Sequence, residues 1–253
     1  MRIRYLSDLH VEFLSAEQVD SLLLQIPPGP DEVCVLAGDI GNPFTANYNK
    51  VMQFIQRNFK KAFVLAGNHE YYHPYYTIEV INNYLENYFQ PFENISFLNN
   101  KIEEYEGCWF VGTTLWSKVT DPRLEIADVS KIQDLDYLAY NRMHMLCVDF
   151  LEGTLADPII QKCVVISHHV PSPNLIDVKY KTSQMRPWNQ WFASDLEELI
   201  EKHQHKIQAW IYGHTHTAAA ASLCGVSFYC NPIGYPRENP HVDLTRVAEI
   251  PSE

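Results

Sequence analysis

Six of the eleven histidines in this chain lie in short polar corners that follow apolar runs. The same corners contain two aspartates and an asparagine, and none of them contains a cysteine. The residues are His10, His69, His168, His169, His214, His216, Asp8, Asp39 and Asn68. Imidazole nitrogens together with carboxylate and amide oxygens suit Mn, Fe or Zn, and do not suit a closed structural zinc site. The pattern therefore predicts a catalytic metal centre.

Two divalent ions would leave such a centre positively charged. Asp8 and Asp39 are the only anionic ligands in the set, and the remaining ligands are neutral. Simple charge counting leaves a surplus of about two positive charges, which is available to hydroxide and phosphate. Taken singly, each residue could be a helix cap, a turn residue or a satisfied polar group. Packing does not require such residues at five strand ends together, so the joint pattern favours metal binding.

The corners need strands to position them. Residues 3–6, 32–37 and 61–66 are β-branched apolar runs that each end in a polar corner, and residues 46–59 show helical spacing between the last two runs. This order predicts a strand, a helix and a strand in a parallel βαβ unit. Ligands bind beyond the carboxyl ends of parallel strands, where the polar corners lie.

The second half of the chain repeats the pattern. Strands are expected at residues 163–166 and 208–212 with a helix at 193–205 between them, which predicts a second βαβ unit. The other expected elements are helices at 76–88 and 132–151, strands at 95–98 and 109–114, and a hairpin of residues 218–223 and 226–230. Residues 171–188 lack strong periodicity and are expected to form a long surface loop beside the histidine corners.

Composition limits the class of protein. The chain has 253 residues, 46% of them hydrophobic, and a formal net charge of −12. These values fit one α/β domain over residues 1–253. The negative charge repels extended nucleic acid and anionic membranes. No run approaches the roughly 18 apolar residues of a spanning helix, and the first ten residues are too polar for a secretory signal.

The six cysteines are scattered, without a CxxC pair, and most lie in apolar runs. This usage is typical of buried thiols in a reducing compartment, so we expect a cytoplasmic protein. Covalent catalysis is not indicated. Ser167 has no Gly-x-Ser-x-Gly elbow, and Cys34 and Cys163 lie within apolar strands.

Five blocks in order resemble the calcineurin-like metallophosphoesterase superfamily. They are Asp8-x-His10, Gly38-Asp39, Gly67-Asn68-His69-Glu70, His168, and Gly213-His214-Thr215-His216. The resemblance implies a four-layer αββα sandwich of two mixed β-sheets flanked by helices. It also implies that Asp8, His10 and His216 bind one metal ion, that Asn68, His168 and His214 bind a second, and that Asp39 bridges the two.

The resemblance implies a two-metal mechanism as well. A bridging hydroxide would attack phosphorus in line with the leaving oxygen. His69 occupies the position of a histidine that is not a ligand and lies beside the leaving group, and we expect it to act as general acid. Glu70 could orient His69 or only hold the loop.

Several residues could contact substrate. His169 could do so or only fill its turn, and Tyr71 and Tyr72 could wall the pocket or pack at the start of a helix. Arg142 could reach the substrate from the long helix or lie solvated at the surface. Tyr235 follows the last corner and could border the site.

The second block narrows the type of phosphoesterase. Phosphoprotein phosphatases of this superfamily continue Gly-Asp with an arginine that grips phosphate, whereas this chain continues with Ile40-Gly41-Asn42-Pro43-Phe44. The chain looks more like the compact bacterial-type members, and we expect hydrolysis of a small phosphodiester or phosphomonoester. The alternative is a scaffold of the same fold that binds protein partners and catalyses poorly. The sequence leaves the oligomeric state open.

Overall fold

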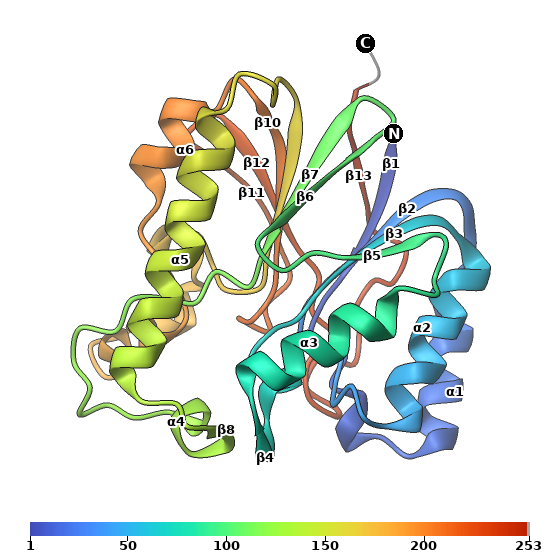
Figure 1. The fold of residues 1–253 in the computed structure, drawn as a ribbon, viewed down its shortest axis with the longest axis horizontal. Coiled ribbons are helices and arrows are strands. Elements are labelled where there is room, and N and C mark those ends of the chain that lie inside the picture. Colours follow the sequence, from blue (N-terminus) through green and yellow to red (C-terminus); the bar gives the residue numbers. More distant parts are fainter. Residues whose placement is uncertain (252–253) are drawn as a thin grey trace.

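Two β-sheets lie face to face in the centre of the molecule (Figure 1). The structure is a computed structural model that describes residues 1–251. The first sheet has the order β13-β1-β2-β3-β5 and consists of β1 (Arg2–Leu6), β2 (Gly29–Ala37), β3 (Phe59–Leu65), β5 (Ile95–Phe97) and β13 (Val247–Glu249). The second has the order β11-β12-β10-β9-β7-β6 and consists of β6 (Lys101–Tyr105), β7 (Cys108–Thr113), β9 (Cys163–Ser167), β10 (Ile207–Tyr212), β11 (Ala219–Leu223) and β12 (Val226–Cys230).

Helices cover the outer face of each sheet (Figure 1). The first sheet is covered by α1 (Ala16–Gln25), α2 (Ala46–Asn58) and α3 (Ile78–Phe89), and the second by α5 (Tyr137–Ala156) and α6 (Glu197–His203). A short α4 (Ala127–Lys131) and the small pair β4 (His73–Thr77) and β8 (Ile132–Gln133) lie at one end of the sandwich. This arrangement confirms the expected αββα layers. Within residues 1–251, no helix combines the length and apolar character that crossing a bilayer requires.

The central strands of both sheets, such as β2, β3 and β9, are buried on both faces, which explains their continuous apolar runs. Residues such as Val35 and Phe63 of the first sheet meet Phe110 and Ile166 of the second between the two sheets. The rings of Phe63 and Phe110 stack with centroids 4.0 Å apart. Alternate residues of the same strands, such as Leu36, face the helices. Side-chain alternation along each strand thus builds an inner and an outer core.

Both predicted βαβ units are present. Strands β2 and β3 pair in parallel, and α2 lies between them in sequence. Strands β9 and β10 also pair in parallel, with α6 between them in sequence. Strand β1 also runs parallel to β2. The carboxyl ends of these five strands therefore bring their polar corners to one region of the molecule. The segment 171–188 is the expected loop, and it contains only short 3₁₀ turns.

Two predicted helices have different boundaries in the structure. The helix expected at 132–151 begins at Tyr137, because Asp136 accepts a hydrogen bond from the Ala139 N–H and caps it, while residues 132–133 pair with β4. The helix expected at 193–205 begins at Glu197, because Ala193 forms an extended bridge with Val170.

The sequence did not predict six of the helices and strands, namely α1, α4, β4, β6, β8 and β13. Helix α1 had a local signal, since Ser15 and Gln18 form a capping box at its start. Strand β6 has little buried surface, and β13 is a three-residue strand that exists only through its pairing with β1 at the other end of the chain. Neither strand shows an apolar run that a local pattern could reveal.

Two glycines offer a test of the packing between the sheets. A Cβ on Gly112 of β7 would collide with the Leu98 side chain between the sheets, whereas a Cβ on Gly153 of α5 would meet open space. We expect Gly112→Ala to lower the free energy of unfolding by about 1–3 kcal/mol through overpacking. The matched Gly153→Ala should raise it by about 0.5–1 kcal/mol, because alanine favours the helix. Urea unfolding measures both, and equal effects of the two substitutions would contradict the packing described.

Candidate dinuclear metal centre

The predicted metal ligands meet at the carboxyl ends of five strands. Asp8 and His10 follow β1, Asp39 follows β2, Asn68 follows β3, His168 follows β9, and His214 and His216 follow β10. Asp8, His10 and His168 are fully buried, and Asp39 and Asn68 are nearly so. Side chains from distant parts of the sequence thus share one buried region between the two sheets.

One group of donor atoms surrounds His10 Nε2. His216 Nε2 lies 3.1 Å from it and Asp39 Oδ2 lies 3.7 Å from it. Asp8 Oδ1 lies 3.4 Å from His216 Nε2 and completes the group. Ligands held about 2.0–2.2 Å from one metal ion lie about 3–3.5 Å from one another. The spacing of this group therefore fits a single ion.

A second group surrounds His168 Nε2. Asn68 Oδ1 lies 3.0 Å away, His214 Nδ1 lies 3.1 Å away, and Asp39 Oδ2 lies 3.4 Å away. The same oxygen of Asp39 therefore belongs to both groups. A carboxylate oxygen between two sets of imidazoles is placed to bridge two ions.

The ring nitrogens opposite these donor atoms already have partners. His10 Nδ1 donates to Glu12 Oε1 at 3.1 Å, and His216 Nδ1 donates to Glu238 Oε2 at 2.6 Å. His168 Nδ1 donates to the Ala37 carbonyl oxygen at 2.9 Å. These bonds leave the Nε2 lone pairs facing one another, and facing lone pairs repel unless a cation lies between them. The residues present therefore fit two divalent cations.

The backbone of the site is held in an uncommon conformation. Five of the seven predicted ligands have left-handed φ angles, namely Asp8 (53°), His10 (47°), Asp39 (53°), His214 (70°) and His216 (48°). Residues other than glycine rarely adopt this region, and such strain is concentrated at functional sites. Close approach also requires glycine at position 67, where a Cβ would collide with Asp39 Oδ1 and His168 Cε1.

Glu70 holds two of the corners together. Its carboxylate accepts hydrogen bonds from the backbone N–H groups of Asp39, Ile40, Gly41 and Gly67. Burial and, to a smaller extent, the Asp39 carboxylate raise the pKa of Glu70 to about 8, although the backbone donors favour the ionised form. Of the two roles considered for Glu70, the contacts support holding the loop.

His69 is oriented by a different carboxylate. Its Nδ1 donates to Glu12 Oε1 at 2.9 Å, the same oxygen that accepts from His10, and its Nε2 lies 3.2 Å from the Tyr235 hydroxyl. Tyr72 stacks against the His69 ring at 4.2 Å. Burial lowers the pKa of His69, but the Asp39 and Glu12 carboxylates outweigh it and raise the pKa above its ordinary value. His69 is thus fixed with Nε2 toward the cavity.

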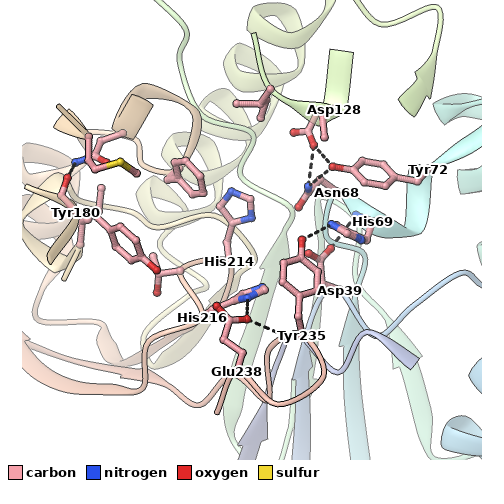
Figure 2. A pocket seen from close by; sticks show the side chains of 17 residues that line it. Asp39, Asn68, His69, Tyr72, Asp128, Tyr180, His214, His216, Tyr235 and Glu238 are labelled. Atoms are coloured by element: carbon pink, nitrogen blue, oxygen red, sulfur yellow. Dashed lines mark hydrogen bonds and ion pairs between the residues drawn. The ribbon is translucent and has the colours of Figure 1, made fainter. Parts of the chain in front are cut away.

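A cavity of about 290 Å³ lies over the two donor groups. Figure 2 shows His69, His214 and His216 lining it together with Tyr72, Tyr180 and Tyr235. Asp128 and Glu238 also reach it. The loop of residues 171–188 contributes Ile176, Tyr180 and Met185, so the segment expected beside the histidine corners forms one wall.

The expected substrate contacts are placed differently. Arg142 lies outside this cavity and lines a separate one, because it is on the face of α5 near Tyr71 and Trp116. Tyr71 is buried, and its hydroxyl donates to Asn82 Oδ1. His169 is also fully buried, with its ring nitrogens at the Thr114 carbonyl oxygen and the Tyr140 hydroxyl. The structure therefore corrects these three expectations, whereas Tyr72 and Tyr235 do line the cavity.

Three carboxylates in the site were not expected from the sequence. Glu12 lies two residues after His10, and this Asp-x-His-x-Glu spacing was an available local signal. Asp128 and Glu238 had no local signal, because the fold brings them from the start of α4 and from the loop after β12.

Known proteins share this arrangement. The family model described as calcineurin-like phosphoesterase matches residues 1–218. The chain belongs to the calcineurin-like phosphoesterase family. Membership together with the Asp and His clusters supports a metal-dependent phosphoesterase in general terms. Tyr235 and Glu238 of this phosphoesterase lie beyond the matched residues.

Individual proteins resemble this chain over most of its length. A protein of Acanthamoeba polyphaga mimivirus, named Uncharacterized protein L509, is 32% identical over 267 residues, which cover 94% of this chain and 93% of that protein. The solved structure of the phosphopantetheinyl hydrolase PptH from Mycobacterium tuberculosis has a TM-score of 0.71 at 17% identity and covers 94% of this chain and 90% of its own. The structure of GAP50, described as the anchor in the inner membrane complex of Plasmodium, has a TM-score of 0.52 at 11% identity, with coverages of 91% and 70%. The two structures show a shared fold.

Glu12 supports two histidines at once, which predicts a distinctive effect of its removal. Because Glu12→Gln disturbs both His10 and His69, we expect it to weaken metal binding and to lower the turnover of the fully loaded enzyme by about 10–100-fold. Glu238 accepts hydrogen bonds from His216 and from the backbone N–H of Tyr235 but makes none to His69. The matched Glu238→Gln should therefore weaken metal binding and leave turnover at saturating metal near the native value. Metal titration with steady-state kinetics measures both, and identical behaviour of the two variants would contradict the shared role of Glu12.

Protons occupy part of the metal-free site. Burial lowers the pKa of both His168 and His216, but neighbouring carboxylates outweigh it. Asp39 and Asp8 raise the pKa of His168 to about 10. Asp8 and Glu238 raise the pKa of His216 to about 9. Below pH 9 each metal-free ring holds a proton that the metal must displace. Metal binding at pH 7 should release both protons, and the apparent affinity should rise with pH up to about 9. Calorimetry in buffers of different ionisation enthalpy measures the release, and a heat independent of the buffer would contradict it.

Proposed function

We propose that this phosphoesterase hydrolyses phosphodiesters with two divalent metal ions and with His69 as general acid. The observation that carries the proposal is the pair of donor groups that share Asp39 Oδ2 beneath a cavity. Mn, Fe and Zn all suit this set of Asp, Asn and His ligands. Two bound ions would supply a nucleophilic hydroxide near neutral pH and positive charge for the phosphoryl oxygens.

The residues of the chain supply the proton and the orientation. His69 Nε2 faces the cavity, where it can donate its proton to the departing alkoxide oxygen. Glu12 accepts the Nδ1 hydrogen bond and stabilises the charged form of the ring. Tyr235 is fixed beside His69 because the backbone N–H of Gly234 donates to the Asp8 carbonyl oxygen at 2.8 Å.

The charges of the cavity favour a diester over a monoester. None of the seventeen described lining residues is Lys or Arg, and Asp128 and Glu238 add negative charge. A phosphomonoester dianion has one more negative charge than a phosphodiester and would find no Lys or Arg among these residues. The missing arginine after Asp39 agrees with this reading.

A scaffold role for protein partners is the alternative. The fold it shares with GAP50, which is described as an anchor, gives that alternative a precedent. This chain retains His69 and all seven ligand positions, and a scaffold has no need of a general acid held by its own carboxylate. We therefore prefer an enzyme.

The first test measures hydrolysis. Protein stripped with a chelator and reloaded with Mn²⁺ should regain hydrolysis of bis(p-nitrophenyl) phosphate, with kcat/KM at least about tenfold above that for p-nitrophenyl phosphate. A preference for the monoester would overturn the diester assignment. Failure to hydrolyse either ester with Mn²⁺, Fe²⁺ or Zn²⁺ would favour the scaffold.

Two substitutions separate the roles of proton donor and metal ligand. His69→Ala should retain both ions and lose about 10²–10⁴-fold in kcat for an ester with a poorly activated alkoxide leaving group. Asp39→Asn should lose both metal and turnover. Metal analysis of each purified variant accompanies the kinetics, and a His69→Ala enzyme with unchanged turnover would refute the general-acid assignment.

A further inference from the structure

Asp128 is a buried carboxylate, and one of its two oxygens accepts no hydrogen bond from the described residues. The residue is 1% exposed and lies in α4, where it lines the cavity over the metal ligands (Figure 2). Its Oδ1 accepts hydrogen bonds from Asn68 Nδ2 at 2.8 Å and from the Tyr72 hydroxyl at 2.5 Å. Its Oδ2 has no hydrogen-bond partner among the described residues. A buried carboxylate oxygen without a donor is costly, so the position calls for one.

The two oxygens of Asp128 have separate roles. The bond from Asn68 Nδ2 fixes the amide so that Asn68 Oδ1 faces His168 Nε2 at 3.0 Å. That contact uses Oδ1 and supports the metal centre. The metal centre makes no use of Oδ2.

The walls around Asp128 are apolar. Ile126 and Ala127 precede it in sequence, and Ile176, Met185 and Phe192 come from the loop and 3₁₀ turns before α6. No Lys or Arg is among the described lining residues, so a second phosphate or a carboxylate of the substrate would face Asp128 without a counter-charge. Such a wall suits an organic group with an apolar body and no anion.

We propose that Asp128 Oδ2 accepts a hydrogen bond from the organic arm of the substrate, which rests on the proposed function. The substrate class is a phosphodiester with a single anionic phosphate and one largely apolar arm that contains an amide N–H, hydroxyl or ammonium donor. Asp128 is then a specificity-determining residue. The metal ions bound by the ligand residues would hold the phosphate, and Asp128 selects the organic arm.

The test uses a matched pair of phosphinates, which carry one negative charge and have no P–O–C bond to hydrolyse. Calorimetry with the Mn²⁺-loaded protein compares (3-acetamidopropyl)methylphosphinate with (3-acetoxypropyl)methylphosphinate, which differ by an N–H in place of an oxygen. The acetamido compound should bind at least about tenfold more tightly, because the ester oxygen leaves Oδ2 without a donor. Equal affinities on the native protein would overturn the proposal without any variant.

A substitution then assigns the preference to Asp128. Asp128→Asn keeps an oxygen for Asn68 and Tyr72 and turns an N–H toward the cavity, so the preference for the acetamido compound should disappear. Asp136→Asn, at the cap of α5 and outside the cavity, should keep it. Retention of the preference in metal-loaded Asp128→Asn would place the donor contact elsewhere and overturn the assignment.

Further outcomes separate the type of donor from the function itself. Tighter binding of (3-aminopropyl)methylphosphinate than of the acetamido compound would support the subsite with an ammonium as its donor, and weaker binding would support it with a neutral donor. Hydrolysis of bis(p-nitrophenyl) phosphate without discrimination between the matched phosphinates would overturn the subsite alone. Absence of both hydrolysis and phosphinate binding would overturn the subsite and the proposed function together.

Discussion

One carboxylate oxygen of Asp39 lies between two groups of imidazole nitrogens, 3.7 Å from His10 Nε2 and 3.4 Å from His168 Nε2. Both groups are buried at strand ends, where unpaired charge and facing lone pairs are costly. Two cations between these atoms would offset that cost, in place of the protons that His168 and His216 hold in the metal-free site. The strained φ angles of the ligands and the four N–H bonds to Glu70 serve to hold Asp39 in this place.

The carboxylates around the metal ligands link binding to catalysis. Glu12 joins His10 to His69 through one oxygen, so the same residue supports a metal ligand and the proposed general acid. Asp128 fixes the amide of Asn68 and leaves its other oxygen without a partner among the described residues. Because no Lys or Arg is among the described residues that line this cavity, its positive charge would come from bound metal ions and from protonated His69, which underlies our proposal of a substrate with one anionic phosphate.

The sequence revealed what depends on local patterns. Apolar runs that end in Asp, Asn or His predicted the central strands and placed nine candidate donor residues at their ends, because parallel strands bring their carboxyl ends together whatever the connections between them. The family resemblance then selected seven of the nine as the expected metal ligands. The remaining features of the site depend on how the fold brings distant segments together. Asp128 and Glu238 reach the cavity from segments without a motif, and Arg142 lies on the part of α5 that lines another cavity, which spacing along the chain does not reveal. Glu12 was the exception, with a local signal two residues after His10.

The most direct test of the two-metal account is anomalous diffraction from crystals of the Mn²⁺-loaded protein. The account predicts two manganese peaks about 3.5–4 Å apart, with Asp39 Oδ2 coordinated to both. One peak should contact Asp8, His10 and His216, and the other Asn68, His168 and His214. A single peak at full occupancy, or two peaks that do not share Asp39, would contradict the account.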